Sequence, residues 1–386
     1  MTRGSAVSET VRPKARLTDD GLSPGALAWR RLRRNRTAMI GAVVLAALYL
    51  LVSLGSFVSP YDPAARDYRA PNMPPTVPRF MDHEGRFHWR PFVYGYRMAD
   101  PVAQRYEVDT SKRYPIRFFV EGYSYRLWWI FPSNIHLFGV DRPGKIALFG
   151  TDASGKDVFS RVLEGGKISL SIGLVGISIS LVIGMLMGAL AGYFGGLWDM
   201  LIMRFVEFLL AVPGLYLIIA LRAYFQTQGV FGIGGQQITS TQMYIIIVVI
   251  LAFVGWAGQA RVIRGMVLAI KEQDFVQAER ALGASTWRII TRHILPNTLS
   301  YVIISATIAV PGYILGEVAL SYLGVGIQEP QVSWGIMLEQ AQSASTIRNQ
   351  PWLLFAPGAF IFITVFAFNF LGDGLRDALD PRHTQE

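Results

Sequence analysis

Residues Asp274–Asn297 read DFVQAERALGASTWRIITRHILPN and form a polar, amphipathic interruption between two long apolar runs. The flanking runs have the length and composition of membrane spans. A connection between spans needs only a few residues, so a segment this long is expected to make contacts of its own. The stretch therefore predicts a membrane protein with a surface outside the bilayer that another component holds.

This segment has the pattern of two short helices joined by a turn. The apolar positions of the first recur at helical spacing: Phe275, Ala278, Ala281 and Leu282. Gly283 can take the left-handed conformation that ends a helix, and Ser285 can cap the next one. In the second helix we expect one shared face made by Trp287, Ile290 and Ile294. Pro296 then marks the entry to the next apolar run.

The composition indicates an integral membrane protein. Of the 386 residues, 52% are hydrophobic and only 16% are charged, which no soluble domain of this length normally shows. The net charge of +9 comes from basic residues beside apolar runs, as in cytoplasmic loops, so nucleic-acid binding is not expected. Without cysteine, disulfides and thiolate catalysis are excluded, and the five scattered histidines have no ligand spacing. We expect neither a catalytic residue, nor a cofactor, nor a metal in this chain.

The first 37 residues predict a cytoplasmic tail followed by an amphipathic helix. Residues 1–22 are polar, and a helix is expected to begin near Ser23 and Pro24 and to lie on the anionic inner surface. Five arginines precede the first span, predicted at 38–59, and they place its N-terminus inside: Arg30, Arg31, Arg33, Arg34 and Arg36. Everything from Ser59 onward is then expected outside, until the next crossing.

Residues 60–149 predict a small extracytoplasmic α+β insert. The stretch is polar, contains prolines and is rich in aromatic residues, and it is far longer than a loop between spans requires. Alternation around Trp89–Tyr96 and Ile116–Tyr123 is typical of short strands, with turns expected at Gly95 and Gly122. The aromatic residues are expected to form the core of this domain rather than a sugar-binding surface.

Residues 150–386 predict a core of five further spans, which makes six transmembrane helices with both termini inside. The expected ranges are 168–198, 201–221, 242–260, 298–315 and 353–371. Breaks are expected at Pro213-Gly214 and at Pro311-Gly312. The fold class is therefore all-α and membrane-embedded, apart from the insert.

Small and polar residues inside the spans suggest packing and pathway positions. Glycines recur every fourth residue and predict a face where another helix approaches closely: Gly184, Gly188, Gly192 and Gly196. Glu207 lies in an apolar run and either faces a water-filled path or pairs with Arg204 three residues earlier. Glu317 and Ser321 are further candidates for lining a pathway.

The segment quoted first also resembles a known family. Ala278, Ala281, Gly283 and Leu295-Pro296 are similar to the loop of bacterial ABC importer permeases that begins Glu-Ala-Ala. In that family the loop is the coupling helix, which sits in a groove of a cytoplasmic ATPase. The resemblance implies that the contacting residues here are Gln277, Ala278, Glu279, Ala281, Leu282, Gly283, Leu295 and Pro296. Three positions depart from the family, since Gln277 stands where it usually has Glu, Glu279 where it has Ala, and His293 where it often has Ile.

Two outer segments narrow the resemblance to permeases of dipeptide and oligopeptide importers. FGTDASGKDVFSR at 149–161 is similar to that family's LGTD-x-x-GRD-x-x-SR, and its Gly155-Lys156 does not form a phosphate loop because Asp157 replaces the magnesium-binding hydroxyl. ALSYLGVGIQEPQVSWGIML at 319–338 is the second segment, in which Ser333 is expected to start a short helix. The resemblance implies the type I importer permease fold in a bacterial inner membrane, with an enlarged periplasmic insert.

The same resemblance implies the function and partners. The chain would form half of a translocation pathway for peptides, the other half being a homologous permease. Two separate ATPase subunits would bind ATP and Mg²⁺, and a substrate-binding protein would deliver the solute. Oligosaccharides, opines or nickel complexes remain alternative substrates. An ion-coupled carrier using Glu207 and Glu317 leaves residues 274–297 unexplained, and the sequence lacks the inverted repeat that many carriers show. For a membrane-bound enzyme, the sequence lacks a paired nucleophile and base in its outer segments.

Overall fold

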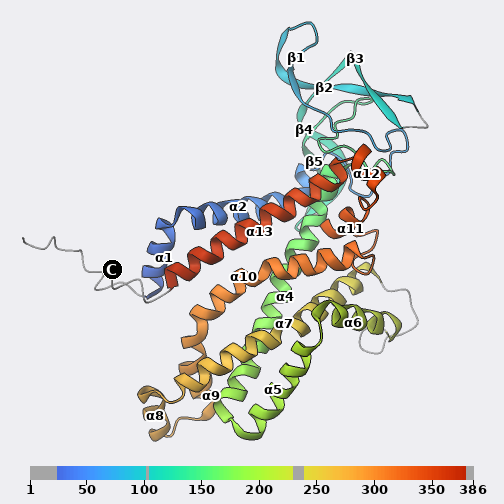
Figure 1. The fold of residues 1–386 in the computed structure, drawn as a ribbon. Coiled ribbons are helices and arrows are strands. Elements are labelled where there is room, and N and C mark those ends of the chain that lie inside the picture. The colour runs from blue at the N-terminus through green and yellow to red at the C-terminus, as the bar shows by residue number, and fades with distance from the viewer. Residues whose placement is uncertain (1–23, 101–103, 229–238, 380–386) are drawn as a thin grey trace, which may run out of the picture.

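A computed structural model describes residues 24–100, 104–228 and 239–379. Long helices form the body of the molecule, and a β-sheet insert lies at one end of it (Figure 1). The short helices α8 (Asp274–Ala281) and α9 (Thr286–Ile289) lie at the other end of the body. The long helix α4 (Val158–Phe194) runs between the two ends. The chain thus presents two distant surfaces joined by helices.

The N-terminal region contains three consecutive helices. They are α1 (Pro24–Arg34), α2 (Arg36–Ser53) and α3 (Gly55–Val58). The side chain of Asn35 accepts a hydrogen bond from the backbone N–H of Ala38 at 3.1 Å, which caps α2 where the polar helix gives way to the apolar one. The predicted first span is present as α2 and α3, with a break at Leu54, while Ser23 lies outside the described residues.

Helices α4 and α7 (Ser240–Ile270) form the central pair of the body. Both exceed the predicted spans: α4 begins ten residues earlier than expected, and α7 runs past Arg261 and Arg264. Helix α7 continues past Arg264 because this arginine forms an ion pair with Asp199 of the helix that follows α4 in the chain. The paired charge can therefore lie within the helix, and the helix does not have to end there. Helix α4 does not include the last four predicted residues, because the chain turns at Gly195 and Gly196, where φ is positive.

The predicted span at 201–221 is not a straight helix. Helix α5 (Gly196–Ala211) and helix α6 (Gly214–Gln228) meet at an angle of 97° around Pro213. Proline removes one helical hydrogen bond and disfavours helix in the residue before it, which explains the position of the bend but not its size. Over the described residues, the chain has five helices able to cross a membrane, or six if this bent pair counts as one span.

The C-terminal half contains two long helices, one of which packs on the first span. Helix α10 (Leu295–Tyr322) is continuous through Pro311, so the predicted break there is wrong, and α13 (Trp352–Leu379) packs along α2. Between them lie α11 (Trp334–Glu339) and α12 (Ala344–Asn349) at the insert end (Figure 1). Ser333 caps α11 as expected, since its Oγ accepts from the N–H of Ile336 at 3.3 Å.

The insert is built from two separate antiparallel sheets. One has the order β1 (Arg79–Met81), β2 (Phe87–Asp100) and β3 (Arg105–Pro115); the other pairs β4 (Arg117–Leu127) with β5 (Phe131–Gly139). The α part of the predicted α+β insert is not found among its described residues, 60–100 and 104–149.

One further expectation for the insert is wrong, and a second is confirmed only in part. Gly95 and Gly122 lie inside strands rather than in turns, at places where the register shifts. Gly122 has a steric role there, because a Cβ would lie 2.5 Å from the ring of His136. The aromatic residues form a core only in part: Phe92 and Tyr94 are buried, whereas Trp89 is 91% exposed and Trp129 is 88% exposed. The two thin sheets do not cover each other, so many strand residues remain exposed outside the buried stretch Phe92–Tyr94.

Candidate functional site

Gly283 forms the turn between α8 and α9. Its φ is +78°, its N–H donates to the carbonyl of Arg280 at 3.0 Å, and the N–H of Ala284 donates to Glu279 at 3.0 Å. These bonds satisfy carbonyls at the end of α8, and the left-handed conformation favours glycine. Ser285 then caps α9, accepting from the N–H of Arg288 at 3.4 Å. The predicted turn, with its two helices, is therefore present.

The outer face of these helices is apolar and exposed. The exposed residues Phe275, Ala278, Ala281, Leu282 and Trp287 are named the coupling surface, after the role that the family resemblance predicts for this segment. Leu282 is 83% exposed and Trp287 61% exposed, which is unusual for large apolar side chains beside many polar ones. This surface lies at the end of the molecule opposite the insert (Figure 1).

A second, buried face holds the coupling surface to the rest of the molecule. Val276, Ile289, Ile290 and Ile294 are buried in the main hydrophobic core. The prediction that Trp287 shares a face with Ile290 and Ile294 is therefore wrong. The chain changes from α9 to a π-helical turn (Ile290–Ile294), which alters the angular spacing of the side chains. Leu295 and Pro296 form the first turn of α10, so this surface is continuous with a membrane-spanning helix.

The positions that depart from the family pattern have different surroundings. Gln277 is exposed, and its amide nitrogen donates to the carbonyl of Lys271 at 3.0 Å. Glu279 is half-buried and lies 3.5 Å from the ring of His293, so it links α8 to the π-helical turn. A carboxylate at 279 therefore does not substitute for one at 277.

Three of the four predicted packing glycines lie against α7. A Cβ on Gly184 would lie 2.8 Å from the Cβ of Gln259, one on Gly188 2.7 Å from the oxygen of Ala260, and one on Gly192 2.8 Å from the oxygen of Arg264. Two helix backbones can approach this closely only where no side chain intervenes. Gly196 is the exception: it begins α5 with a φ of +54°, and no atom lies near the position of its Cβ.

The pathway candidates separate into a buried group and a surface pair. Glu317 is fully buried and accepts hydrogen bonds from Ser169 at 2.9 Å and from Ser321 at 2.7 Å. Glu207 is half-exposed and pairs with Arg204 at 3.0 Å, the structural alternative considered from the sequence. A pathway role for Glu317, Ser321 or Glu207 stays a prediction, and this arrangement favours structural roles.

An ion-pair cluster at the insert end escaped the sequence analysis. The guanidinium of Arg161, 1% exposed, lies 3.3 Å from Asp152 and 3.2 Å from Glu329, while Lys156 lies 2.7 Å from Glu329. Partial burial acts to raise the pKa of Glu329, but the Lys156 hydrogen bond and the charge of Arg161 outweigh it and hold that pKa below its ordinary value. The two segments that resemble peptide permeases, 149–161 and 319–338, thus bind each other here.

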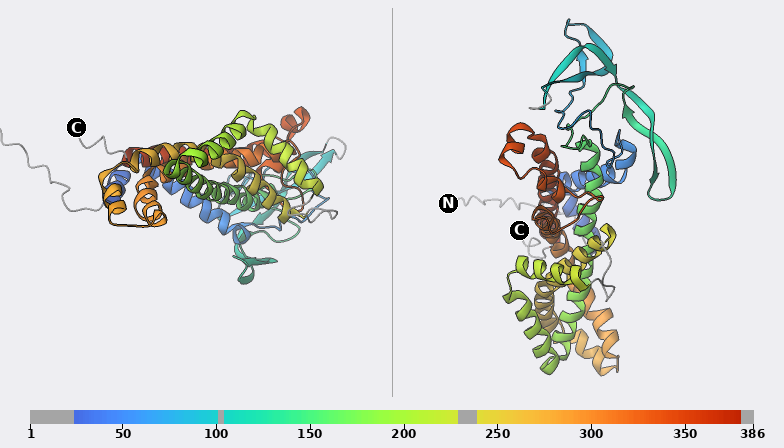
Figure 2. Two further views of the ribbon diagram at one scale, coloured as in Figure 1. Left: turned by 90° about the horizontal axis from the view of Figure 1, so that it is seen from below. Right: turned by 90° about the vertical axis from the view of Figure 1, so that its right-hand side faces the viewer.

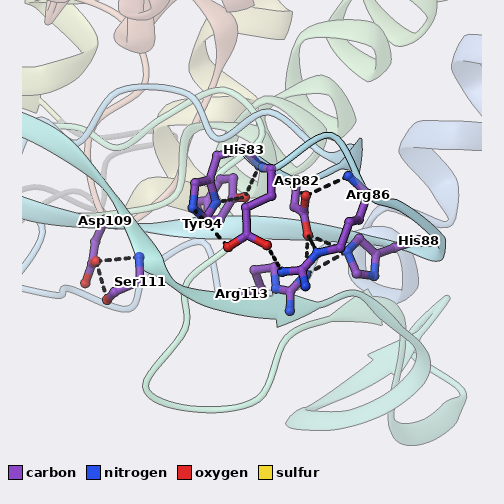
Figure 3. A network of polar contacts seen from close by, with 9 residues as sticks. Asp82, His83, Arg86, His88, Tyr94, Asp109, Ser111 and Arg113 are labelled. Atoms are coloured by element: carbon purple, nitrogen blue, oxygen red, sulfur yellow. Dashed lines mark hydrogen bonds and ion pairs between the residues drawn. The ribbon is translucent and has the colours of Figure 1, made fainter.

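A second polar network stabilises the first sheet of the insert. Asp82 accepts hydrogen bonds from His88 at 3.0 Å and from Arg113 at 2.8 Å, and Arg86 lies beside it (Figure 3). The bond from His88 and those from Arg86 keep the pKa of Asp82 well below its usual range. In the part of the chain that the structure describes, no group of three or more His, Asp or Glu side chains has a geometry suited to a metal ion.

Comparisons with known proteins agree with this organisation. Residues 181–385 match the family "Binding-protein-dependent transport system inner membrane component", and residues 23–75 match the N-terminal transmembrane domain of oligopeptide transport permease C. The dipeptide transport system permease DppC of Bacillus subtilis is 33% identical over 96% of this chain and 88% of its own length. The oligopeptide permease OppC of Haemophilus influenzae is 44% identical over 51% of this chain and 58% of its own length.

A structural comparison found a more distant neighbour, an inward-facing form of the MetNI methionine ABC transporter. The match has a TM-score of 0.43 and 19% identity, and covers 57% of this chain and 96% of that one. Family membership rests on the sequence matches, which cover more than half of the chain and include both its first span and its coupling surface. The chain belongs to the family of binding-protein-dependent transport system inner membrane components, as a relative of the C-type permeases of peptide ABC importers.

Proposed function

We propose that this chain forms half of the transmembrane pathway of an ATP-driven importer and receives its driving force through the coupling surface. The observation that carries the proposal is the exposure of Leu282 and Trp287 on a hydrogen-bonded turn at the end opposite the insert. Exposed apolar side chains of this size on a capped helix pair are expected to be covered in the assembled protein. A cytoplasmic ATPase of the importer is the partner that the family resemblance implies.

The orientation follows from charge. Helix α1 carries Arg30, Arg31, Arg33 and Arg34, and it lies on the same side of the body as α8 and α9 (Figure 1). Arginines near the ends of spans remain in the cytoplasm. Both termini and the coupling surface are then cytoplasmic, and the insert is periplasmic.

The buried face of the α8–α9 pair supports the coupling mechanism. Ile289, Ile290 and Ile294 belong to the same core as the membrane helices, so a displacement of the coupling surface moves α10 with it. Closure of two ATP-loaded ATPases would thereby switch the permease between inward-open and outward-open states, as a rigid-body change. ATP and Mg²⁺ act only in those partner subunits.

The remaining partners and the substrate follow from the relatives. The two relatives named above are permeases of peptide transport systems, and a further one is the glutathione permease GsiD of Escherichia coli, 43% identical over 49% of this chain. Peptides are therefore the proposed substrate class. A homologous second permease would complete the pathway, and a periplasmic binding protein would deliver the peptide to the insert end.

The test compares two glycines with the same backbone strain at opposite ends of the molecule. Gly283 has a φ of +78° and Gly85 a φ of +80°, and neither has an atom near the position of its Cβ. Gly283→Asp strains the turn and adds a charge to the coupling surface, whereas Gly85→Asp strains an insert turn only. Both variants should reach the membrane, and co-purification of the ATPase should fall about tenfold for Gly283→Asp alone.

The outcomes separate clearly. Normal ATPase recovery and peptide uptake in the Gly283→Asp complex would remove the coupling assignment. Equal loss in both variants would trace the defect to folding rather than to docking. Gln277→Glu is expected to be tolerated, because Gln277 is exposed and contacts only the carbonyl of Lys271 in its own chain.

A further inference from the structure

The hairpin of β4 and β5 ends in an exposed apolar turn. Leu127 pairs with Phe131, and the three residues between them form the turn: Trp128, Trp129 and Ile130. Their exposed fractions are 51%, 88% and 71%, and Phe131 is 58% exposed. Four consecutive large apolar residues at the tip of a hairpin would face water if nothing covered them.

The backbone of this turn makes the two tryptophans more unusual. Trp128 and Trp129 both have positive φ, +50° and +60°, and the N–H of Ile130 donates to the carbonyl of Leu127 at 3.1 Å. Positive φ at both central residues is the geometry of a type I′ turn, which favours Asn-Gly and disfavours bulky side chains. A hairpin selected only to fold would have small residues here, so the two tryptophans indicate a role outside the fold.

The base of the hairpin is fixed to the outer end of the first span. One ring nitrogen of His136 in β5 lies 3.0 Å from the carbonyl oxygen of Ser56, and the ring of Phe119 in β4 packs on Phe57 with centroids 6.3 Å apart. Both partners belong to α3, directly after α2. The direction of the hairpin is therefore set relative to the membrane helices and not only to the insert.

That direction brings the tip back toward the membrane. The right view of Figure 2 shows the hairpin leaving the insert at the side of the molecule and running back past the outer end of the first helices. The left view shows it projecting sideways from the helix bundle. Helix α2 presents large apolar side chains outward on its exposed face, as a lipid-facing helix does: Ile40, Val43 and Leu50.

The chemistry of the tip fits a membrane–water interface. Tryptophan concentrates there because its ring is apolar and its N–H can still bond to headgroups or water. The stretch 124–134 contains Arg126, which is exposed, and no acidic residue, so it suits anionic headgroups. We propose that the tip of this hairpin, Leu127–Phe131, inserts into the outer leaflet and anchors the periplasmic insert on the lipid surface.

The absence of cysteine from the chain allows a direct test. Trp129→Cys and the control Trp89→Cys, each carrying an NBD fluorophore, are compared in the full-length chain with its co-purifying subunits. Both labelled proteins are reconstituted into nanodiscs. The nanodisc lipids are phosphatidylethanolamine, phosphatidylglycerol and a lipid that carries a nitroxide near the top of its acyl chain. Trp89 is 91% exposed on the other sheet and is the matched position. The label at 129 should emit at shorter wavelength and be quenched about threefold more strongly than the label at 89.

A second pair of proteins separates anchoring from folding. Ile130→Cys carries the same label with or without the double change Trp128→Asn and Trp129→Gly, which installs the residues that a type I′ turn favours. The double change should keep or raise the melting temperature and abolish lipid quenching at 130. Quenching that persists without the tryptophans would overturn the proposal. So would a label at 129 that is blue-shifted but not quenched by the lipid nitroxide, since a protein partner would then cover the tip.

Discussion

Asp157 offers a sharp test of the energetics at the insert end. It caps the first turn of α4, accepting from the N–H of Ser160 at 2.8 Å and from the Ser160 hydroxyl at 2.6 Å, and its second oxygen has no partner. Burial raises the pKa of this carboxyl to about 6 from its ordinary value of 3.8, more than the two Ser160 hydrogen bonds lower it. A neutral acceptor should therefore suit the site better than a carboxylate at neutral pH.

The magnitude follows from the two pKa values. A difference of about 2 between the folded and unfolded pKa corresponds to about 3 kcal/mol. Because the pKa of Asp157 is higher in the folded protein than in the unfolded one, the protonated carboxyl favours folding. This contribution to the free energy of unfolding is fully present below about pH 4 and is lost as the pH rises through about 6. Asp157→Asn keeps the capping oxygen and avoids the buried charge, so at pH 7.5 it should be the more stable protein by up to about 3 kcal/mol.

The assay is thermal unfolding in detergent, followed by tryptophan fluorescence between pH 4 and 7.5. Asp157→Asn should match the parent at pH 4 and melt higher at pH 7.5 by up to roughly 6 °C. Asp141→Asn is the control, since Asp141 is an exposed carboxylate that pairs with Arg117 at the surface. A melting temperature lowered by Asp157→Asn at pH 7.5 would refute the reasoning, because it would mean that a charged cap is favoured.

Two further predictions concern packing and topology. Gly188→Leu should destabilise the protein by about 1–3 kcal/mol, because the added side chain separates α4 from α7. Gly258→Leu is the control and should be tolerated in a thermal melt, since nothing lies within 4 Å of a Cβ at that position. Equal effects of the two changes would contradict the close packing. Single cysteines at Ser111 and Thr239 should react with an impermeant maleimide added outside, and one at Thr286 only after permeabilisation. Labelling of position 286 in intact cells would reverse the proposed orientation.

The sequence alone determined the features that depend on neighbouring residues. The apolar runs predicted membrane helices because length and hydropathy are local quantities. The turn at Gly283 and the caps by Ser285 and Ser333 were predictable because each depends on one backbone conformation or on bonds within a few residues. The proposed coupling surface could be suggested from the sequence for the same reason, since its residues lie in one continuous segment.

Tertiary structure decided what depends on a distant partner. Gly188 and Gly196 share one periodicity, yet only Gly188 meets another helix, because the chain turns at Gly195. The Arg161–Glu329 pair joins residues that are far apart in sequence, and so does the hydrogen bond from Ser169 to the buried Glu317.

The insert gives the clearest example of the difference. Its aromatic residues predicted a core, since aromatic burial is the commoner outcome. Whether a strand face is buried depends on a second layer, and here the two sheets do not provide one, so Trp89 and Trp129 remain exposed. Strand periodicity determines which side chains share a face, but only the packing of other elements determines whether that face meets protein, lipid or water.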